Sequence, residues 1–166
     1  TKKRMAEKMP NAKVHVEEMS IEQCRYDSEL FDMVIGNAVL HHTDFKMAID
    51  SVWRVLKPGG IAIFLEPLGM NFMLNSYRRL TPAYRSPDEK PLTKIEIMQI
   101  QERFASVTRK GYFMVSLPVI FLAGIFGEYK FYQNILRSAI RMDSLFINSF
   151  KLTMNYCWYN LFVCSK

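Results

Sequence analysis

The clearest pattern of apolar and polar positions lies within Phe31–Pro67. Phe31–Gly36 is a short apolar run, which is typical of a strand buried on both faces. Asp44–Lys57 repeats apolar residues every three or four positions, which predicts a helix with one face in water. Pro58-Gly59-Gly60 should end that helix, and Ile61–Leu65 is a second buried strand. Strand, helix and strand of these lengths predict one right-handed βαβ unit with parallel strands.

Candidate functional residues follow from this unit, because ligands of parallel sheets bind beyond the carboxyl ends of the strands. The polar turn Asn37–His42 leaves the first strand, and Glu66 ends the second. A lone histidine on an apolar face is more often a core residue, but the pair His41-His42 directly after a strand is better placed for chemistry. No third ligand is spaced to join these histidines, so we expect no metal site.

The helical and strand-like spacings of apolar residues also predict the other elements. In chain order they are a basic helix remnant over Thr1–Met9, a short strand over Lys13–Glu17, a helix opened by the capping box of Thr93 and Glu96, a strand over Ser106–Leu117, a helix over Glu128–Phe150 and a last strand over Met154–Cys164. The apolar positions expected to pack the long helix are Tyr132, Ile135, Leu136, Ala139 and Ile140.

One stretch, Gly111–Gly127, carries no charge over its length. A membrane helix needs roughly 17–25 residues, so this stretch is at the lower limit, and Pro118 and Gly124 interrupt it. Its first half is better explained as a core strand. Its second half, Val119–Phe126, is apolar enough for a lid over a site or for a shallow membrane contact.

Composition narrows the class of protein. A chain of 166 residues with 49% hydrophobic content suits one domain with its own core. The net charge of +6 is spread along the chain, without the dense basic stripe typical of nucleic-acid binding. The three cysteines show no metal-binding spacing and are read as reduced thiols, which indicates a cytoplasmic protein.

The segments FDMVIGNAVLHH and WRVLKPGGIAIFLEP together resemble the fourth and fifth strands of class I S-adenosylmethionine-dependent methyltransferases of the type 11 kind. The resemblance implies an α/β, Rossmann-like fold with a mostly parallel sheet and an antiparallel last strand beside the fifth. It also implies that residues 1–166 are a single C-terminal portion of such a domain. Its core would be 11–67, its substrate-side lid and helices 68–150, and its last strand about 154–164.

The resemblance further implies where the cofactor S-adenosylmethionine would lie. Its amino-acid and sulfonium end would pass along Asn37, Ala38 and Val39, with His42 beside them. Its adenine would contact the loop at Ser20 and Ile21, where Ser20 replaces a common Asp and Glu18 or Glu22 offers an alternative acceptor. His42 and His41 are the candidate catalytic residues, because histidine is the natural base near neutral pH.

The segment RRLTPAYRSPDEKPL resembles a region that follows the fifth strand in bacterial methyltransferases of small molecules and lipids, departing at Lys90. The residues expected on the substrate side are Glu66, Arg78, Arg85, Asp88 and Glu89. An arginine there would hold a polar or anionic group of a small, lipid-like or glycosylated acceptor. The alternative is a solvated loop whose bends are fixed by prolines.

The family's Gly-rich turn and its ribose-binding acid are absent from this sequence, and nothing before Lys13 could supply two strands. We therefore expect a fold truncated at its N-terminus, with an exposed sheet edge, which binds S-adenosylmethionine only weakly by itself and is inactive alone. Two alternatives remain. One is a non-catalytic interaction module that forms a homodimer through that edge, and the other is a membrane-peripheral, lipid-binding protein.

Overall fold

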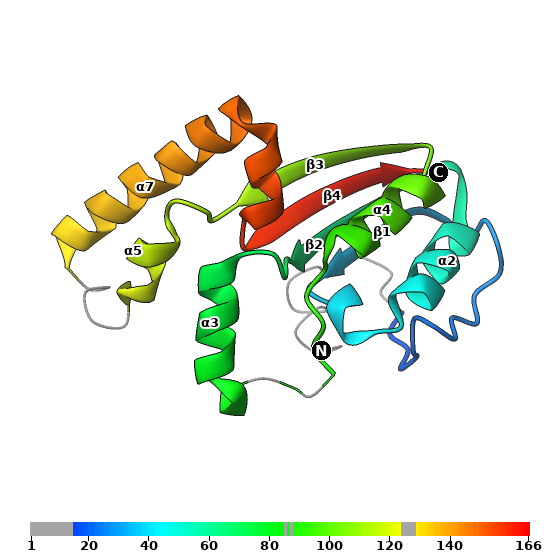
Figure 1. Ribbon diagram of the computed structural model, residues 1–166. Helices are drawn as coiled ribbons and strands as arrows, with labels where there is room; N and C mark the ends of the chain where they lie inside the picture. Colours follow the sequence, from blue (N-terminus) through cyan, green and yellow to red (C-terminus); the bar gives the residue numbers. More distant parts are fainter. Residues whose placement is uncertain (1–14, 85, 87, 124–128) are drawn as a thin grey trace.

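The computed structural model describes residues 15–84, 86, 88–123 and 129–166 (Figure 1). Four strands form one sheet: β1 (Phe31–Asn37), β2 (Leu56–Pro67), β3 (Ser106–Tyr112) and β4 (Tyr159–Ser165). The α-helices are α2 (Phe45–Val55), α3 (Phe72–Leu80), α4 (Lys94–Arg103), α5 (Leu117–Phe121) and α7 (Lys130–Ser149). Short 3-10 helices are η1 (Leu40–His42), η2 (Pro82–Tyr84) and η3 (Lys151–Tyr156).

The described strands lie in the order β1-β2-β4-β3. β1 and β2 are parallel, whereas β4 is antiparallel to both β2 and β3. The predicted βαβ unit and the antiparallel last strand beside the second strand of that unit are therefore confirmed. Within the described residues β1, β2 and β3 run in the same direction, and only β4, which enters between β2 and β3, opposes them, so the expectation of a mostly parallel sheet with an antiparallel last strand is confirmed.

The N-terminal predictions have a divided outcome. The helix remnant over Thr1–Met9 lies outside the described residues, as do Lys13 and Val14 of the predicted strand. The described part of that strand, His15 to Glu17, has no strand structure.

Helix α2 begins and ends for local reasons. The Asp44 side chain caps its N-terminus by accepting the Met47 N–H at 3.1 Å. The helix ends at Val55 and β2 begins at Leu56, so Pro58-Gly59-Gly60 is not the stop that was predicted. Pro58 disfavours the helical conformation at Lys57, the residue before it. The helix has already ended by then, because Leu56 is extended. The glycines instead lie where the β1–β2 register is irregular, and Gly59 has a φ of +73°.

One face of the sheet carries the hydrophobic core. Helices α2 and α4 lie against this face and contact each other (Figure 1). The core residues are buried and apolar, and they are Leu40, Ala48, Ile49, Val52, Leu56, Ala62, Phe64, Leu68, Leu92, Ile97, Ile100, Phe104, Phe162 and Cys164. The capping box of Thr93 and Glu96 that was predicted for α4 is present.

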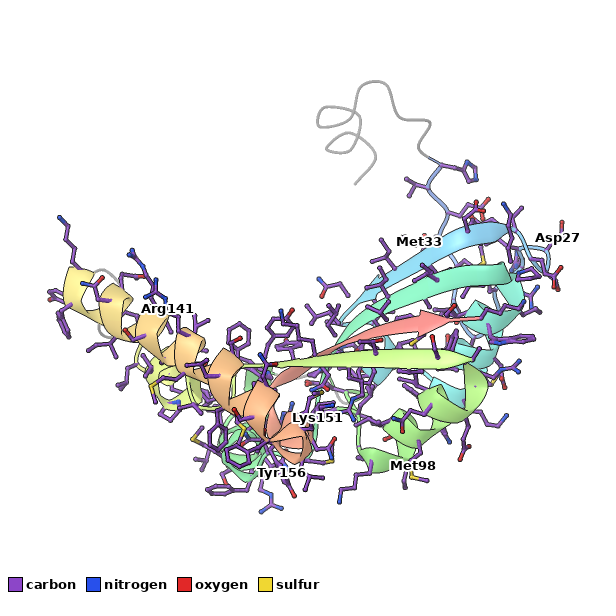
Figure 2. The ribbon with its side chains drawn as sticks, turned by 90° about the horizontal axis from the view of Figure 1, so that it is seen from above. Asp27, Met33, Met98, Arg141, Lys151 and Tyr156 are labelled. Carbon is purple, nitrogen blue, oxygen red and sulfur yellow. The ribbon has the colours of Figure 1, made fainter. Side chains whose placement is uncertain are left out.

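The opposite face of β1 differs from its prediction. The sequence suggested burial on both faces, but Met33 is 48% and Ile35 is 69% exposed. β1 is the edge strand of the described sheet (Figure 2), and no described helix covers this face of it. Burial of such a strand therefore depends on a second layer, which its own apolar sequence cannot supply.

The C-terminal region departs most from the predictions. β3 ends at Tyr112 rather than Leu117, and the following residues begin α5. Helices α5 and α7 extend beyond the sheet as an arm (Figure 1). Ile135 and Ile140, expected to pack, are 50% and 42% exposed, whereas Asp143 is buried. The last strand begins at Tyr159, because residues from Lys151 onward form η3.

In the part of the chain that the structure describes, no helix is both long enough and apolar enough to cross a membrane.

Candidate functional site

The turn after β1 is held by one buried carboxylate. Glu66, at the end of β2, is fully buried and accepts the backbone N–H groups of Val39 and Leu40 on Oε1, each at 2.9 Å. Its Oε2 lies 2.8 Å from His41 Nδ1. Ala38 has a φ of +52°, and its N–H donates to the Leu65 carbonyl at 2.8 Å. These bonds fix the turn at the carboxyl ends of both parallel strands.

Both oxygens of Glu66 are occupied within the chain, so its geometry suits a positioning residue. A buried carboxylate costs free energy unless it is hydrogen-bonded, and here two amides and an imidazole supply those bonds. His41 is buried as well, with 6% of its side chain exposed. Its backbone carbonyl accepts the Lys90 N–H at 2.7 Å, which ties the segment after η2 to the turn.

His42 faces outward from the same turn. Its Nδ1 lies 3.3 Å from Asp88 Oδ2 and 3.3 Å from Ser86 Oγ. The His41 and His42 rings are 4.1 Å apart between their centroids. Asp88 is exposed, and its pKa is lowered by a backbone hydrogen bond, then by the Ser86 hydroxyl and by His42. The carboxylate is therefore ionised near neutral pH and can orient the His42 imidazole.

The loop predicted to hold adenine meets the start of α2. Glu22 Oε1 accepts the Asp44 N–H at 3.1 Å, two residues beyond His42. The Ser20 hydroxyl donates to the other Glu22 oxygen, and these contacts lower the pKa of Glu22. Ile21 packs against the core. The fold thus brings Ser20 and Ile21 toward the Asn37–His42 turn. The Ser20 hydroxyl, however, already donates a hydrogen bond to Glu22.

The predicted substrate residues occupy different places. Arg78, on α3, donates to the Leu68 carbonyl at 3.0 Å and so lies against the end of β2. The Glu89 N–H donates to the Ser86 carbonyl at 3.2 Å, beside Asp88. Arg85 lies outside the described residues. Asp88 and Glu89 are thereby near His42, and Arg78 is near the strand that ends in Glu66.

Tyr159 was missed by the sequence reasoning. It begins β4 and pairs with Pro67, directly after Glu66. Burial raises the pKa of its hydroxyl, as do the carboxylates of Glu66 and Glu89, while Arg78 opposes them. Tyr159 therefore shares the electrostatic environment of three predicted site residues. Because β4 is antiparallel to β2, its first residue lies at the carboxyl end of β2. The predicted antiparallel last strand was therefore the sequence feature that could have pointed to Tyr159.

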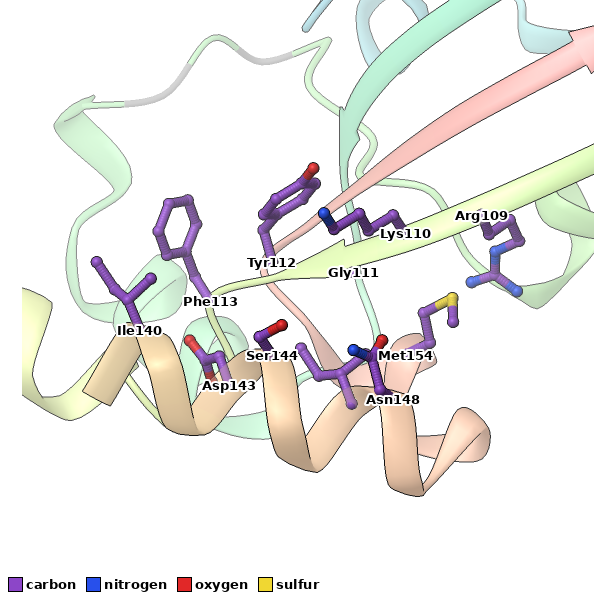
Figure 3. Close-up of a pocket in the computed structure, with 11 residues that line it drawn as sticks. Arg109, Lys110, Gly111, Tyr112, Phe113, Ile140, Asp143, Ser144, Asn148 and Met154 are labelled. Carbon is purple, nitrogen blue, oxygen red and sulfur yellow. The ribbon is translucent and has the colours of Figure 1, made fainter. Parts of the chain in front are cut away.

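Two cavities lie away from this turn. One, of about 230 Å³, lies between β3 and α7, with Arg109, Tyr112, Asp143 and Asn148 among its lining residues (Figure 3). The second, of about 270 Å³, is lined mainly by apolar residues of β1 and α2 together with Ile21. Neither is lined by Asn37–His42, so these two cavities and the predicted chemistry are at different places.

The comparisons with known proteins agree with the fold. A family model described as "Methyltransferase domain" matches residues 1–64. No curated protein sequence matches the chain.

Several solved structures are similar. A methyltransferase from Thermotoga maritima, titled a possible histamine N-methyltransferase, is 14% identical with a TM-score of 0.59, covering 99% of this chain and 70% of its own. The YcgJ protein of Bacillus subtilis is 13% identical with a TM-score of 0.58, covering 99% and 76%. Phosphoethanolamine N-methyltransferase 2 of Haemonchus contortus, solved with phosphomonomethylethanolamine and S-adenosylhomocysteine, is 16% identical with a TM-score of 0.53, covering 89% and 36%.

Identities this low establish shared architecture rather than shared substrate. The matched β1–α2–β2 unit, the strand order and the antiparallel last strand all agree with the resemblance read from the sequence. Residues 1–64 match the methyltransferase-domain family, and the chain has the fold of the class I S-adenosylmethionine-dependent methyltransferases.

Proposed function

We propose that this chain forms one wall of an S-adenosylmethionine site and serves methyl transfer to a small acceptor. The observation that carries the proposal is the turn Asn37–His42, which Glu66 fixes at the carboxyl ends of β1 and β2. This is where open α/β sheets bind their ligands. When bound, S-adenosylmethionine supplies a methyl group on a sulfonium, which is already activated for displacement.

The cofactor would lie along the turn and the loop before β1. Val39 keeps 42% of its surface exposed at this edge, and Asn37 is also exposed, so both can contact a ligand. Ile21 offers an apolar contact for an adenine ring. These residues fit one side of the cofactor. Proximity and alignment carry much of the barrier reduction in such a displacement, so a rigid turn is the main requirement.

His42 is the proposed base for an acceptor that must lose a proton. When Nδ1 donates to Asp88, the lone pair of Nε2 is left to take that proton. His41 is buried and bound to Glu66, so we assign it a positioning role in the same turn. Arg78, Arg85, Asp88 and Glu89 would bind polar groups of the acceptor, which we propose to be lipid-like or glycosylated.

The cofactor site can be tested by nuclear magnetic resonance on the labelled chain of residues 1–166. Millimolar S-adenosylhomocysteine should shift the amides of Ala38, Val39 and Leu40. Adenosine alone should shift residues near Ile21 and leave the turn less affected. Shifts confined to the cavity between β3 and α7, or no shifts at all, would contradict the proposal.

Affinity and turnover form a second test. Calorimetry of the same chain should give weaker than micromolar affinity for S-adenosylmethionine, since no described residue supplies a Gly-rich turn. Methyl transfer should be assayed by mass spectrometry on phosphoethanolamine, a glycosylated lipid and a sterol. With an acceptor found, His42→Ala should lower kcat about 100-fold, the usual share of a general base, and His41→Gln should act through stability instead. An unchanged kcat in His42→Ala would remove His42 from the mechanism.

A second candidate function rests on the exposed face of β1 and on its outer edge, which no described strand pairs. Met33 and Ile35 leave apolar surface in water, and unpaired strand edges pair readily with other chains. The chain would then be a non-catalytic module that dimerises through this edge. Light scattering after gel filtration separates the two functions: a dimer lost in Ile35→Lys, without ligand shifts at Asn37–His42, favours the module.

A further inference from the structure

Charge is divided unevenly along this chain. Of the 16 acidic residues, only Glu128 and Asp143 follow Phe104, while seven Lys and Arg residues do so. From Tyr129 to Lys166, all of which is described, Asp143 is the sole acidic residue. The excess positive charge of the protein is therefore concentrated in the part that contains α7 and β4.

Asp143 does not offset this charge at the surface. It is 4% exposed, and its Oδ1 accepts the N–H groups of Met114 at 3.1 Å and of Ser116 at 3.2 Å, together with that of Val115. The Ser116 hydroxyl donates to its other oxygen. The carboxylate thus anchors α7 to the start of α5. The outer surface of α7 carries cations and no anion.

The buried face of α7 is narrow. Its buried residues recur at Tyr132, Ala139, Asp143 and Ile147, spaced for one side of a helix. This side packs on α5 and on the end of β3. Apart from Leu136, which is partly buried, the other residues of α7 are exposed.

A second apolar stripe lies on that solvent-facing surface. Its residues are exposed and share one side of the helix at 3.6 residues per turn, and they are Phe131, Ile135, Met142, Leu145 and Phe146. Leu145 is 71% exposed, and the stripe continues past the helix end with Phe150 and with Leu152, which is 82% exposed. Phe146, Phe150 and Leu152 line an open apolar groove of about 440 Å³, with Lys151 in its wall.

The cations lie next to this stripe. Lys130, Arg137 and Arg141 are exposed, and their spacing of seven and four residues places them together on another side of α7, away from its buried face. Figure 2 labels Arg141 on the part of α7 that extends beyond the sheet. A helix of 20 residues is about 30 Å long, so the stripe and the cations form one extended surface. A helix with an apolar side, a basic side and no exposed acid is typical of helices that lie in a membrane interface.

We propose that this surface, formed by the outer stripe of α7 with Phe150 and Leu152, docks on an anionic lipid bilayer. The apolar side chains enter the headgroup region, and Lys130, Arg137, Arg141 and Lys151 contact the lipid phosphates and carboxylates. The charge complementarity selects an anionic bilayer over a second copy of this chain, because two identical basic surfaces would repel each other. The proposal does not depend on methyl transfer.

Flotation with vesicles tests it on the complete chain of residues 1–166. Vesicles of phosphatidylcholine with phosphatidylserine should carry the protein upward, and vesicles of phosphatidylcholine alone should carry much less. Binding should fall as salt rises, because exposed charges are screened. A wild-type chain that stays at the bottom with both vesicles overturns the proposal.

Two variants separate the apolar and charged contributions. Met142→Gln with Leu145→Gln should weaken binding about tenfold on the anionic vesicles. Arg137→Gln with Arg141→Gln should remove the preference for anionic lipid, also by about tenfold. These side chains are exposed, so circular dichroism should remain unchanged.

The matched controls carry the same changes elsewhere. Phe72 and Leu80 are 83% and 82% exposed on α3, so Phe72→Gln with Leu80→Gln removes comparable apolar surface. Lys46→Gln with Lys94→Gln removes two exposed cations. Equal losses in the controls and in the α7 variants would overturn the proposal. So would a dimer in light scattering that the α7 variants dissociate, because the occupant would then be a second copy.

Discussion

Two buried carboxylates perform the same structural task at opposite ends of this molecule. Glu66 binds the N–H groups of Val39 and Leu40, and Asp143 binds those of residues 114–116. Each thereby closes a turn that follows a strand. Glu66 also binds a buried histidine, whereas Asp143 binds a serine hydroxyl.

The difference lies in what each turn presents to solvent. The Glu66 turn lies at the carboxyl ends of parallel strands and leaves Asn37, Val39 and His42 exposed. The Asp143 contact fixes a helix whose outer side is apolar and basic. We propose that the same device positions a small-molecule site in one place and a docking surface in the other. A buried carboxylate that accepts backbone N–H groups therefore says little about function by itself, and the surface around the turn must also be considered.

The largest effect is expected at Glu66. Glu66→Ala leaves two amides and the imidazole of His41 without their acceptor in a fully buried place, so the free energy of unfolding should fall by about 3–5 kcal/mol. Urea unfolding followed by circular dichroism measures this. Glu66→Gln keeps one acceptor oxygen and should lose less. A loss under about 1 kcal/mol in Glu66→Ala would mean that water replaces the carboxylate.

Asp143→Ala should cost less, about 2–3 kcal/mol, because Asp143 lines the cavity between β3 and α7, where water can reach the amides left without an acceptor. Hydrogen exchange should become faster at residues 114–116 and along α7, with no change at residues 38–41. Asp143→Asn, which keeps an acceptor, should restore most of the protection. Faster exchange in both turns would contradict this expectation, because it would show that the two regions unfold as one unit.

The protein also contains two buried thiols, one near Asp143 and one in the core, and they predict a loss of stability in alkali. Burial raises the pKa of Cys157, near Asp143, to about 12, and that of Cys164, in the core, to about 12. The folded state holds both protons while the unfolded thiols lose theirs above about pH 8.5. Stability is therefore complete below that pH and declines as pH rises toward 12, by at most about 1.4 kcal/mol per pH unit for each thiol.

Urea unfolding between pH 8 and 10 measures this slope. Cys164→Ala should remove the contribution of the core thiol to this pH dependence of the unfolding free energy. Cys157→Ala should remove the contribution of the thiol near Asp143. A slope that neither variant changes would assign the alkaline loss to other groups, such as tyrosines.

The smallest effect is expected at Asp88, which is exposed. Its lowered pKa means that the ionised carboxylate stabilises the fold above the ordinary aspartate range. That contribution is lost as pH falls through the lowered pKa. Carbon-detected titration should place the Asp88 midpoint below that of a free aspartate, and Ser86→Ala should raise it. A normal midpoint in the wild-type protein would show that the contacts with Ser86 and His42 do not persist in solution.

The sequence by itself determined the βαβ unit, the capping of α4, the last strand and the position of the histidine pair. These depend on local periods and caps, which neighbouring residues decide. Only the tertiary structure showed that His41 is bound to Glu66 and His42 lies beside Asp88, since these partners are 25 and 46 positions apart.

The same limit applies to burial. The apolar pattern of β1 could not reveal that Met33 and Ile35 face solvent, because burial on a second face depends on another layer. The sequence predicted one packed face of α7 that included Ile135 and Ile140, and only the packing on α5 and β3 showed that these two are exposed while Asp143 lies on the inner face. Local chemistry fixes which elements form, and the contacts between distant elements decide which of their faces are free to bind.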